Sequence, residues 1–327
     1  MKAIVYHNYG SPDVLKCEEI EKPIVGDDDV LIKVRAASAN PLDWHDMRGA
    51  PYMLRIGTGL RKPTSPRLGV DLAGQVEAVG RNVTQFQPGD EVFGASRGAF
   101  AEYVCARENR LVLKPANLTF EQAAAIPVAA ITALQGLRDK GRIQPGQKVL
   151  INGAAGGVGT FAVQIAKSFG ADVTGVCSTR NVDMVRSIGA DQVIDYTQED
   201  FTQSGQRYDL ILDSVGNHSL SACRRVLSPK GTYVMVGAPS GRWIKPLPRL
   251  LKVLLLSRFV SQNLIFFVAS INKDDLVVLK ELMEAGKVTP VIDRRYKLSE
   301  VPEAIRYLEE GHVRGKVAIT LEHNSKT

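Results

Sequence analysis

A glycine-rich turn is the stretch of this sequence whose residue types and spacing could hold a charged ligand. Residues 153–171 read GAAGGVGTFAVQIAKSFGA and directly follow KVLIN, an apolar run typical of a strand. Glycines allow positive φ angles and close backbone approach, so a diphosphate can rest on N–H groups at the positive end of a helix. Strand, turn and helix in this order are the context of a dinucleotide site. Tight packing of helix on strand, without a ligand, is the alternative. We expect contacts from Ala155, Gly156, Gly157 and Val158.

The end of the next strand indicates which dinucleotide would bind. About twenty residues beyond the turn, a site for NAD places an acidic residue that receives the ribose hydroxyls. This sequence has Ser178, Thr179 and Arg180 there. Hydroxyls and a guanidinium suit a 2′-phosphate, which a carboxylate would repel, so NADPH is expected in preference to NADH. In the alternative interpretation Arg180 only covers the surface, while Ser178 and Thr179 begin the next helix.

The elements around the turn predict a doubly wound parallel sheet. Apolar strands at 148–153, 172–177, 192–196, 208–216 and 231–238 alternate with helical patterns at 157–169 and 182–188. Strands and helices that alternate in this way form parallel sheets with helices on both faces. We expect a Rossmann domain over residues 123–269.

The first third of the chain has a different pattern. Short β-rich runs separated by turn residues stand at 2–7, 29–38, 69–80, 91–95 and 101–106, which predicts an antiparallel, barrel-like domain. A helix is expected over 120–141, with Thr119 and Gln122 at its start and Gly141 at its end. The final strand, 316–322, is expected to return to this first domain, which therefore spans residues 1–122 and 270–327.

Composition limits the function classes. A chain of 327 residues is long enough for two domains, and 44% hydrophobic residues place it among globular proteins. The net charge of +6 comes without a dense basic arm, so nucleic acid is not an expected partner. The four cysteines form no CxxC pair, which argues against disulfides and a four-thiolate zinc site. The first twenty residues lack the apolar stretch of a secretory signal, so a cytoplasmic location is expected.

Several motifs in order resemble the medium-chain dehydrogenase/reductase superfamily, and within it the zinc-independent quinone oxidoreductases related to zeta-crystallin. The resemblance spans nearly the whole chain. Its motifs are VLIKVRAASANPLDWHDMRG (30–49), GVDLAGQVEAVG (69–80), FQPGDEVFG (86–94), GAFAEYV (98–104), IPVAAITALQGL (126–137) and the AAGGVG turn. It implies an α/β fold in which a Rossmann sheet is joined to a GroES-like antiparallel β-barrel domain, with the cofactor in the cleft between them.

Where zinc alcohol dehydrogenases of this superfamily have metal ligands, the sequence departs from their pattern. Ala39-Asn40-Pro41 replaces the segment with a cysteine, and Gly69-Val70-Asp71 replaces Gly-His-Glu. Asn, Val and Asp cannot assemble a thiolate–imidazole site, so no metal is expected. Hydride transfer without a Lewis acid favours acceptors that are already electron-poor, such as quinones and enones.

The resemblance places the segment NPLDWH beside the nicotinamide. Asn40 is expected to hold a substrate carbonyl or the cofactor amide, and Asp43 to orient the turn. His45 could donate a proton to the reduced acceptor, although a packed histidine with solvent as the proton source is the alternative. Trp44 and Tyr52 are expected as apolar walls of the substrate pocket, or simply as core residues.

Further cofactor contacts are carried over from the resemblance alone. Thr132 is expected near the nicotinamide and Tyr196 at the adenosine phosphate. The remaining contacts implied are Ser214, Val215, Val236, Gly237, Phe267, Val268, Ala269, His312, Val313 and Arg314.

Residues 240–262 combine five basic residues with leucines. Charges interrupt each apolar run well short of the roughly 20 residues that a membrane span needs, so the segment is not expected to cross a bilayer. It is expected to cover the substrate pocket or a subunit contact, with peripheral binding to an anionic membrane as the alternative.

The sequence thus predicts an NADPH-dependent oxidoreductase that delivers hydride to a quinone or an α,β-unsaturated carbonyl compound. A zinc-free alcohol or aldehyde reductase and a non-enzymatic NADPH-binding sensor remain as alternatives. A homodimer is expected by analogy, with the strand YVMVGA as the pairing edge.

Overall fold

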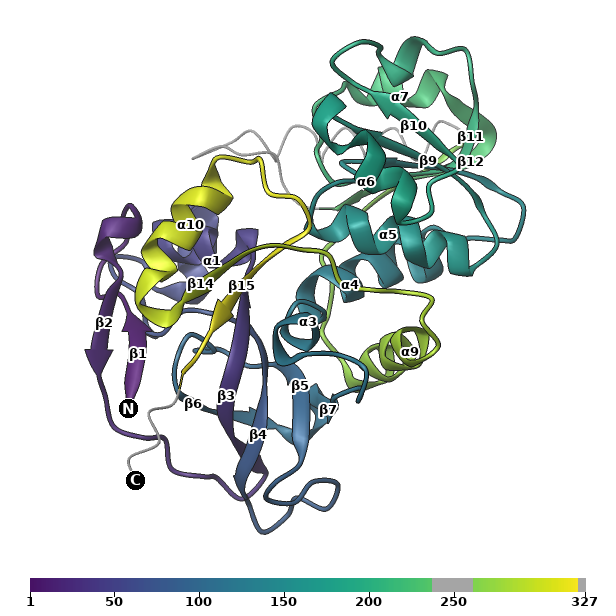
Figure 1. Ribbon diagram of the computed structural model, residues 1–327. Helices are drawn as coiled ribbons and strands as arrows, with labels where there is room; N and C mark the ends of the chain where they lie inside the picture. The colour runs from purple at the N-terminus through teal and green to yellow at the C-terminus, as the bar shows by residue number, and fades with distance from the viewer. Residues whose placement is uncertain (237–260, 323–327) are drawn as a thin grey trace. The chain divides into compact units, whose positions relative to one another are not determined.

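The chain divides into two compact units in the computed structural model, which describes residues 1–236 and 261–322. Unit 1 contains Met1–Ala129, Ile271–Gly286 and Pro290–Thr327, and unit 2 contains Ala130–Ser270 and Lys287–Thr289. Figure 1 labels their helices and strands.

Unit 2 is built on a six-stranded parallel sheet with the order β10-β9-β8-β11-β12-β13. Its strands are β8 (Lys148–Asn152), β9 (Asp172–Cys177), β10 (Gln192–Asp195), β11 (Tyr208–Asp213), β12 (Leu227–Val236) and β13 (Asn263–Phe267). The strand order reverses between β8 and β11, and ligands of open α/β sheets bind beyond the carboxyl ends of the strands at such a point.

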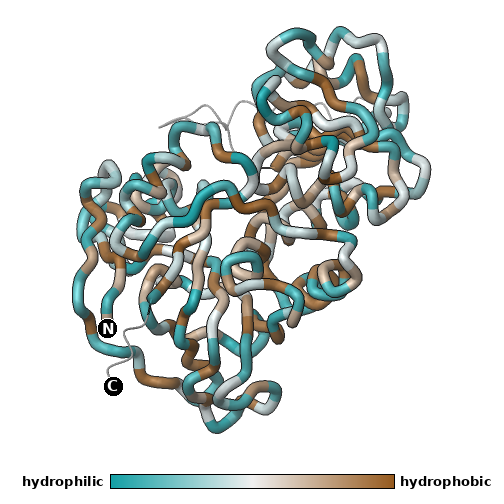
Figure 2. Tube along the Cα trace, viewed as in Figure 1, coloured by the Kyte–Doolittle hydropathy of each residue, from teal (hydrophilic) through white to brown (hydrophobic). Residues whose placement is uncertain are grey.

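Helices α5 (Gly157–Ser168), α6 (Val182–Ser187) and α7 (Leu220–Arg225) accompany this sheet. α5 packs on β8 and β9, and all of its residues from Gly159 to Ala166 are buried. The strands appear as brown, apolar stretches in Figure 2, as expected for a sheet whose central strands are buried on both faces.

Unit 1 contains a mostly antiparallel seven-stranded sheet with the order β14-β15-β3-β4-β5-β7, in which β6 pairs with β3. A separate antiparallel pair, β1 (Lys2–Val5) and β2 (Lys16–Glu19), is bridged to the chain at Arg67 and Ala101, outside the sheet. The strands of the sheet are β3 (Asp29–Ala39), β4 (Asp71–Val79), β5 (Glu91–Ala95), β6 (Tyr103–Arg107), β7 (Leu111–Leu113), β14 (Ile292–Lys297) and β15 (Lys316–Thr320).

The α-helices outside unit 2 are α1 (Pro41–Arg48), α2 (Arg55–Thr58), α3 (Phe120–Ala124), α9 (Lys273–Glu284) and α10 (Val301–Glu309), with α4 (Pro127–Leu134) running across the division. α1 packs against α10, as Figure 1 shows. Arg48 and Glu309 join these two helices by a two-pronged ion pair. The short helical turns are η1 (Pro12–Val14), η2 (Tyr52–Leu54), η3 (Glu108–Arg110), η4 (Gln135–Lys140), η5 (Thr179–Asn181), η6 (Phe201–Gln203) and η7 (Leu298–Glu300).

The single helix expected over 120–141 is wrong in one respect. Thr119 and Gln122 form the capping box, and Gly141 ends the helical stretch, as expected. The stretch is nevertheless divided into α3, α4 and η4, a turn of π-helix. Pro127 causes the first break, because proline disfavours helical backbone at the residue before it.

The expected pairing edge is also wrong. The strand YVMVGA corresponds to the end of β12, which lies between β11 and β13. The backbone groups of its described residues are therefore already paired within the sheet, and among the described strands β13 is the outer one on that side.

No helix in the described ranges is long and apolar enough to cross a membrane. Residues 237–260 lie outside those ranges. The expectation for Gly237 therefore lies outside the described residues. The same holds for the segment 240–262, except for its last two residues.

Candidate functional site

The start of α5 is a candidate anion site in unit 2. β8 ends at Asn152, and the chain turns through Gly153, whose φ of 87° lies in the region that glycine favours. Gly156 is the N-cap, and α5 begins at Gly157. The first N–H groups of a helix have no partner within it, so the backbone of this turn presents donors at the positive end of the helix dipole.

The glycines of the turn have different tasks. A Cβ on Gly159 would stand 2.0 Å from the carbonyl oxygen of Gly153, so this glycine is required by the packing of the turn itself. A Cβ on Gly156 would meet only that same oxygen, at 3.5 Å, which is an ordinary contact. Space is therefore left open at Gly156, as a cradle for a diphosphate requires.

Asp213 organises the loop after β11, on the same edge of the sheet. Its buried carboxylate accepts the N–H groups of Val215 and Gly216, at 3.0 and 2.8 Å, and the hydroxyl of Tyr233 at 2.6 Å. The Ser214 hydroxyl donates to the Asn152 carbonyl at 2.8 Å, so this loop is joined to the end of β8. Ser214 and Val215 thus lie at the reversal point, with Val215 49% exposed.

The π-helical turn η4 holds the segment after β13. The side-chain amide of Gln135 donates to the carbonyl of Ser270 at 2.7 Å and accepts its N–H at 3.1 Å. This clamp fixes the chain just beyond Phe267, Val268 and Ala269, and Val268 is left 82% exposed. π-helical turns are frequent at functional sites. Thr132 lies in α4, the helix that precedes η4.

The ends of β9 and β10 bring a carboxylate to the residues from which the cofactor preference was inferred. Ser178, Thr179 and Arg180 follow β9, and the last two are exposed. A carboxylate from the neighbouring strand reaches them, because Thr179 Oγ1 donates to Asp195 Oδ2 at 2.6 Å. The next residue, Tyr196, is 56% exposed. The carboxylate that the end of β9 lacks is therefore present nearby, on the neighbouring strand β10.

Unit 1 contains a buried polar cluster at the carboxyl end of β3. Its members are Ser38, Asn40, Asp43, Asp71 and Lys316, each no more than 3% exposed. Asp71 Oδ2 accepts the Ser38 hydroxyl at 3.0 Å and the Asn40 amide at 2.9 Å. Lys316 Nζ lies 3.5 Å from the same oxygen and donates to Asn40 Oδ1.

Two of these residues are Asn40 and Asp71. By the resemblance, they occupy positions that are zinc ligands in the zinc-binding members of the superfamily. The ammonium of Lys316 is the cation that the structure places between them. A zinc ion does not fit this donor set, because the amide and carboxylate oxygens already receive protons from the protein. Across the described residues, no three His, Cys, Asp or Glu side chains gather as a metal site would need.

The role expected for Asn40 requires correction. One hydrogen of its side-chain amide goes to Asp71 and the other to the carbonyl of Ser38, at 3.3 Å. Its oxygen accepts from Lys316. With its amide so engaged and only 1% of the residue exposed, Asn40 has no N–H to offer a substrate carbonyl or a cofactor amide.

Charges in the cluster are balanced by its hydrogen bonds. Burial raises the pKa of Asp71 and lowers that of Lys316, but the donors around Asp71, including the Val128 N–H at 3.0 Å, favour its ionised form. Burial also raises the pKa of Asp43 to about 8. The raised pKa of Asp43 disfavours a second buried carboxylate beside Asp71.

Asp43 and His45 lie on α1. Asp43 Oδ2 accepts the backbone N–H of Asn40 at 2.7 Å and so fixes the start of the helix. His45 Nδ1 lies 2.7 Å from the Ala50 carbonyl, which can only accept, so this nitrogen carries a proton. In the neutral ring Nε2 is then an acceptor, and burial lowers the pKa of His45. Only the imidazolium could donate a proton from Nε2.

The two aromatic residues expected as pocket walls are held by neighbours. Trp44 stacks on the ring of His45 at a centroid distance of 3.7 Å and packs on the core of unit 1. The Arg55 guanidinium lies over the rings of Tyr52 and Tyr9, at 4.6 and 4.4 Å. Both tryptophan and tyrosine are half-buried, so each can present an edge to a ligand.

The loop His312, Val313 and Arg314 belongs to unit 1 and precedes β15. Asp293 Oδ2 fixes it by accepting the N–H of Arg314 at 3.0 Å. His312 and Arg314 are exposed side chains.

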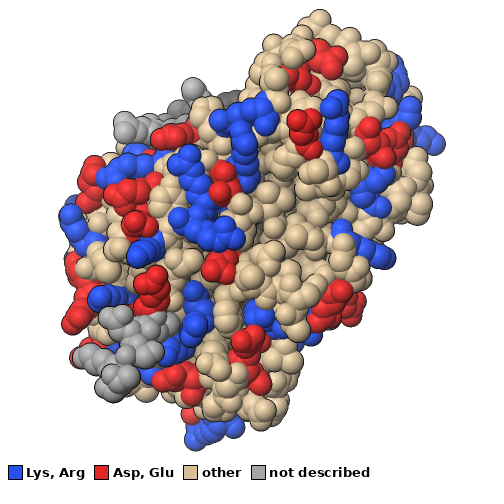
Figure 3. Space-filling view, in the orientation of Figure 1, with Lys and Arg blue, Asp and Glu red and all other residues tan. Residues whose placement is uncertain are grey.

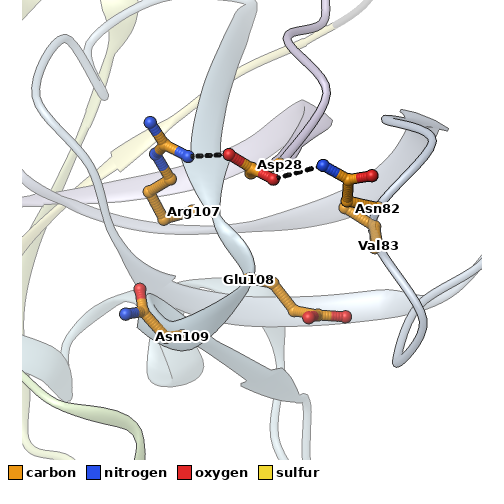
Figure 4. Close-up of a pocket in the computed structure, with 6 residues that line it drawn as sticks. All are labelled: Asp28, Asn82, Val83, Arg107, Glu108 and Asn109. Carbon is orange, nitrogen blue, oxygen red and sulfur yellow. Dashed lines mark hydrogen bonds and ion pairs between the residues drawn. The ribbon is translucent and has the colours of Figure 1, made fainter.

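A hollow of about 220 Å³ lies at the opposite end of β3 from the cluster and contains none of the expected site residues. Figure 4 shows Asp28 between Arg107 and Asn82, which donate to it at 2.7 and 2.8 Å. Glu108 accepts the N–H groups of Thr84 and Gln85. Its charged groups therefore already have partners within the protein.

Sequence reasoning missed Lys316, Asp195 and Gln135. Lys316 begins the apolar strand KVAIT, where a lysine usually marks an exposed strand end, so nothing local indicates its burial. Asp195 lies in the run QVIDY, and only the pairing register, Asp195 opposite Cys177, brings it to Thr179. No local signal indicates Gln135, because its partner Ser270 is far away in the sequence.

Comparison with known proteins places both units in known families. Residues 26–116 match the family described as alcohol dehydrogenase GroES-like domain, and residues 188–319 match the family described as zinc-binding dehydrogenase.

Relatives and a solved structure match nearly the whole chain. A 2-methylene-furan-3-one reductase of Solanum lycopersicum is 36% identical over 98% of this chain and 79% of its own length. A chloroplastic NADPH-dependent alkenal/one oxidoreductase of Arabidopsis thaliana is also 36% identical, with the same shares covered. The structure of a quinone oxidoreductase from Coxiella burnetii matches with a TM-score of 0.87 and 32% identity, covering 98% of this chain and 99% of that one.

The fold, a Rossmann-like unit with a GroES-like unit, defines the class of medium-chain reductases. The chain belongs to the medium-chain dehydrogenase/reductase superfamily, and within it to the quinone oxidoreductase-like subfamily.

Proposed function

We propose that this protein reduces quinones or α,β-unsaturated carbonyl compounds with hydride from NADPH, and that it does so without zinc. The observation that carries the proposal is the start of α5, where a turn with open space at Gly156 stands at the reversal point of a parallel sheet. The names of the relatives, an alkenal/one oxidoreductase that depends on NADPH and a quinone oxidoreductase, support the substrate class.

The residues of unit 2 would bind the dinucleotide along one sheet edge. The N–H groups of Gly157 and Val158, with Ala155 and Gly156 beside them, would hold the diphosphate. Ser178, Thr179, Arg180 and Tyr196 would surround the adenosine ribose and its phosphate. Thr132, Ser214, Val215, Val236 and the segment Phe267–Ala269 would line the nicotinamide half. His312, Val313 and Arg314 remain proposed cofactor contacts from the resemblance alone.

NADPH supplies the hydride, so the protein has to position the reactants and stabilise the oxygen anion that develops. Quinones and enones are electron-poor and need little further activation. Asn40 would act through Lys316 and Asp71 as part of a rigid support beneath α1, and not as a donor to the substrate. Trp44 and Tyr52 would offer flat apolar surfaces to the acceptor.

The proton that completes the reduction would come from solvent. His45 has its Nδ1 proton engaged by Ala50, and burial lowers its pKa, which disfavours the imidazolium. This makes the histidine a weak proton donor, although sequence reasoning considered that role for it.

We also propose a cytoplasmic homodimer. Among the described strands of the unit 2 sheet, β13 offers the outer edge that a second copy could extend. The cellular location rests on the sequence alone, and the Arabidopsis relative is chloroplastic.

An assay of NADPH oxidation tests the proposed function. Purified protein is supplied with a panel of quinones, enones and saturated aldehydes, and its metal content is measured on the same sample. We expect turnover with quinones or enones, little with saturated aldehydes, and less than stoichiometric zinc. Turnover confined to alcohols or aldehydes, or activity that follows bound zinc, would overturn the proposal.

A further inference from the structure

Asp195 is the last residue of β10. This strand pairs with β9, and the residues that follow β9 are those from which the cofactor preference was inferred. β9 and β10 are parallel, and their register places Asp195 opposite Cys177. Both strands therefore end level at the same edge of the sheet, and Thr179 lies two residues beyond Cys177. In dinucleotide-binding sheets this edge receives the adenosine ribose.

The carboxylate of Asp195 is held in place from two sides. Thr179 Oγ1 donates to Oδ2 at 2.6 Å, and Gln198 Nε2 donates to it at 3.1 Å. Thr197 donates its N–H and its hydroxyl to Oδ1, at 3.0 and 2.8 Å. These bonds, that of Thr179 first, lower the pKa of Asp195. A fixed negative charge therefore stands beside the proposed phosphate-binding residues.

This contact changes what Thr179 can do. A hydroxyl has one proton, and Thr179 gives it to Asp195. A fully ionised 2′-phosphate offers only acceptor oxygens, so Thr179 is a poor partner for it in this arrangement. A ribose 2′-hydroxyl can instead donate to a carboxylate, which is how the acidic residue of NAD sites acts.

We propose that Asp195 is a specificity residue that weakens the preference for NADPH and lets the enzyme use NADH as well. It takes, from the neighbouring strand, the place of the acidic residue that is absent from the end of β9. Arg180 attracts the 2′-phosphate and Asp195 repels it, so the balance of these two charges sets the ratio between the cofactors. The inference rests on the proposed function, because it requires nicotinamide dinucleotide at this edge.

The test compares kcat/KM for NADPH and NADH in Asp195→Asn and in the natural protein. Asparagine keeps an oxygen that accepts from Thr179 or Thr197 but removes the charge. We expect the NADPH to NADH ratio to rise about tenfold, mainly through a lower KM for NADPH.

Asp191→Asn is the matched control. Asp191 directly precedes β10 and pairs with Lys167 at 2.7 Å. It therefore lies at the amino ends of the parallel strands, whereas the proposed site lies at their carboxyl ends. This variant changes net charge by the same amount and should leave the ratio unchanged. Thermal unfolding of both variants shows that each is folded.

Two outcomes would overturn the inference. An unchanged ratio in folded Asp195→Asn, with turnover intact, contradicts the role of Asp195 alone. Failure of the natural protein to bind either nucleotide in a calorimetric titration contradicts the proposed function, and the inference with it.

Discussion

At the scale of single residues, hydrogen-bond partners decide what a side chain can contribute to chemistry. Asn40 and Thr179 both have the donors that their expected roles require, but neighbouring acceptors already take those protons. Gly156 would contribute in a different way, because the absence of a Cβ leaves open space at the start of α5. Residue type therefore indicates candidates, and the partners of each candidate decide among them.

His45 carries a prediction about pH. Its buried ring should have a pKa below the ordinary value of 6.5, measurable by NMR titration. Below pH 6.5 the unfolded chain binds a proton that the folded ring resists, so this residue should lower the free energy of unfolding as the pH falls.

Replacement of His45 by Gln tests its catalytic role. If solvent supplies the proton, kcat with an enone at pH 7 should fall less than about threefold. A general acid typically contributes about 10²–10⁴-fold, so a loss of that size would show that His45 donates the proton after all.

At the scale of elements, the buried cluster joins the starts of four elements. Asn40 begins α1, Lys316 begins β15, and Asp71 begins β4 while accepting the Val128 N–H near the start of α4. These elements are far apart in sequence, so the cluster fixes their ends relative to one another. A hydrophobic contact would not impose the same geometry, because it lacks direction.

Lys316→Met should remove the cation and leave Asp71 as an unpaired buried charge. Breaking a buried pair in this way costs about 3–5 kcal/mol, which urea unfolding would measure. The double variant Lys316→Met with Asp71→Asn should lose less, since no isolated charge remains. Equal losses in the single and the double variant would contradict a coupled pair.

The element boundaries show what the sequence could and could not predict. The alternation of apolar strands and helices predicted the parallel sheet and the start of α5 correctly. The run IDRRYK, which forms β14, was missed, because its charges conceal a strand that pairs at the sheet edge with β15. Contacts such as Lys316 with Asn40 depend on long-range packing, which no local pattern records.

At the scale of the molecule, charges of both signs are mixed over the face shown in Figure 3. The positive net charge therefore does not gather into one basic surface on that face.

Members of the superfamily share one architecture, so a sequence that has several of its motifs in the same order predicts the fold well. Which acceptor the enzyme reduces depends instead on the detailed geometry of its binding site, because the fold alone does not determine function.

The proposed dimer is a prediction at this scale. Light scattering coupled to size exclusion should give about twice the 35.6 kDa mass of one chain. If β13 is the shared edge, hydrogen exchange of its outward N–H groups should slow as the protein concentration rises. A mass near that of one chain at micromolar concentration would argue against the dimer.

Calorimetric titration of NADPH into the natural protein and into Gly156→Ala tests the central claim most directly. The added methyl group fits the protein but occupies the space left for the diphosphate, so binding should weaken about tenfold or more while the fold is retained. Gly57→Ala, where a Cβ also meets open space, should bind as the natural protein does. Equal affinity in all three proteins, or no binding to the natural protein, would contradict the account.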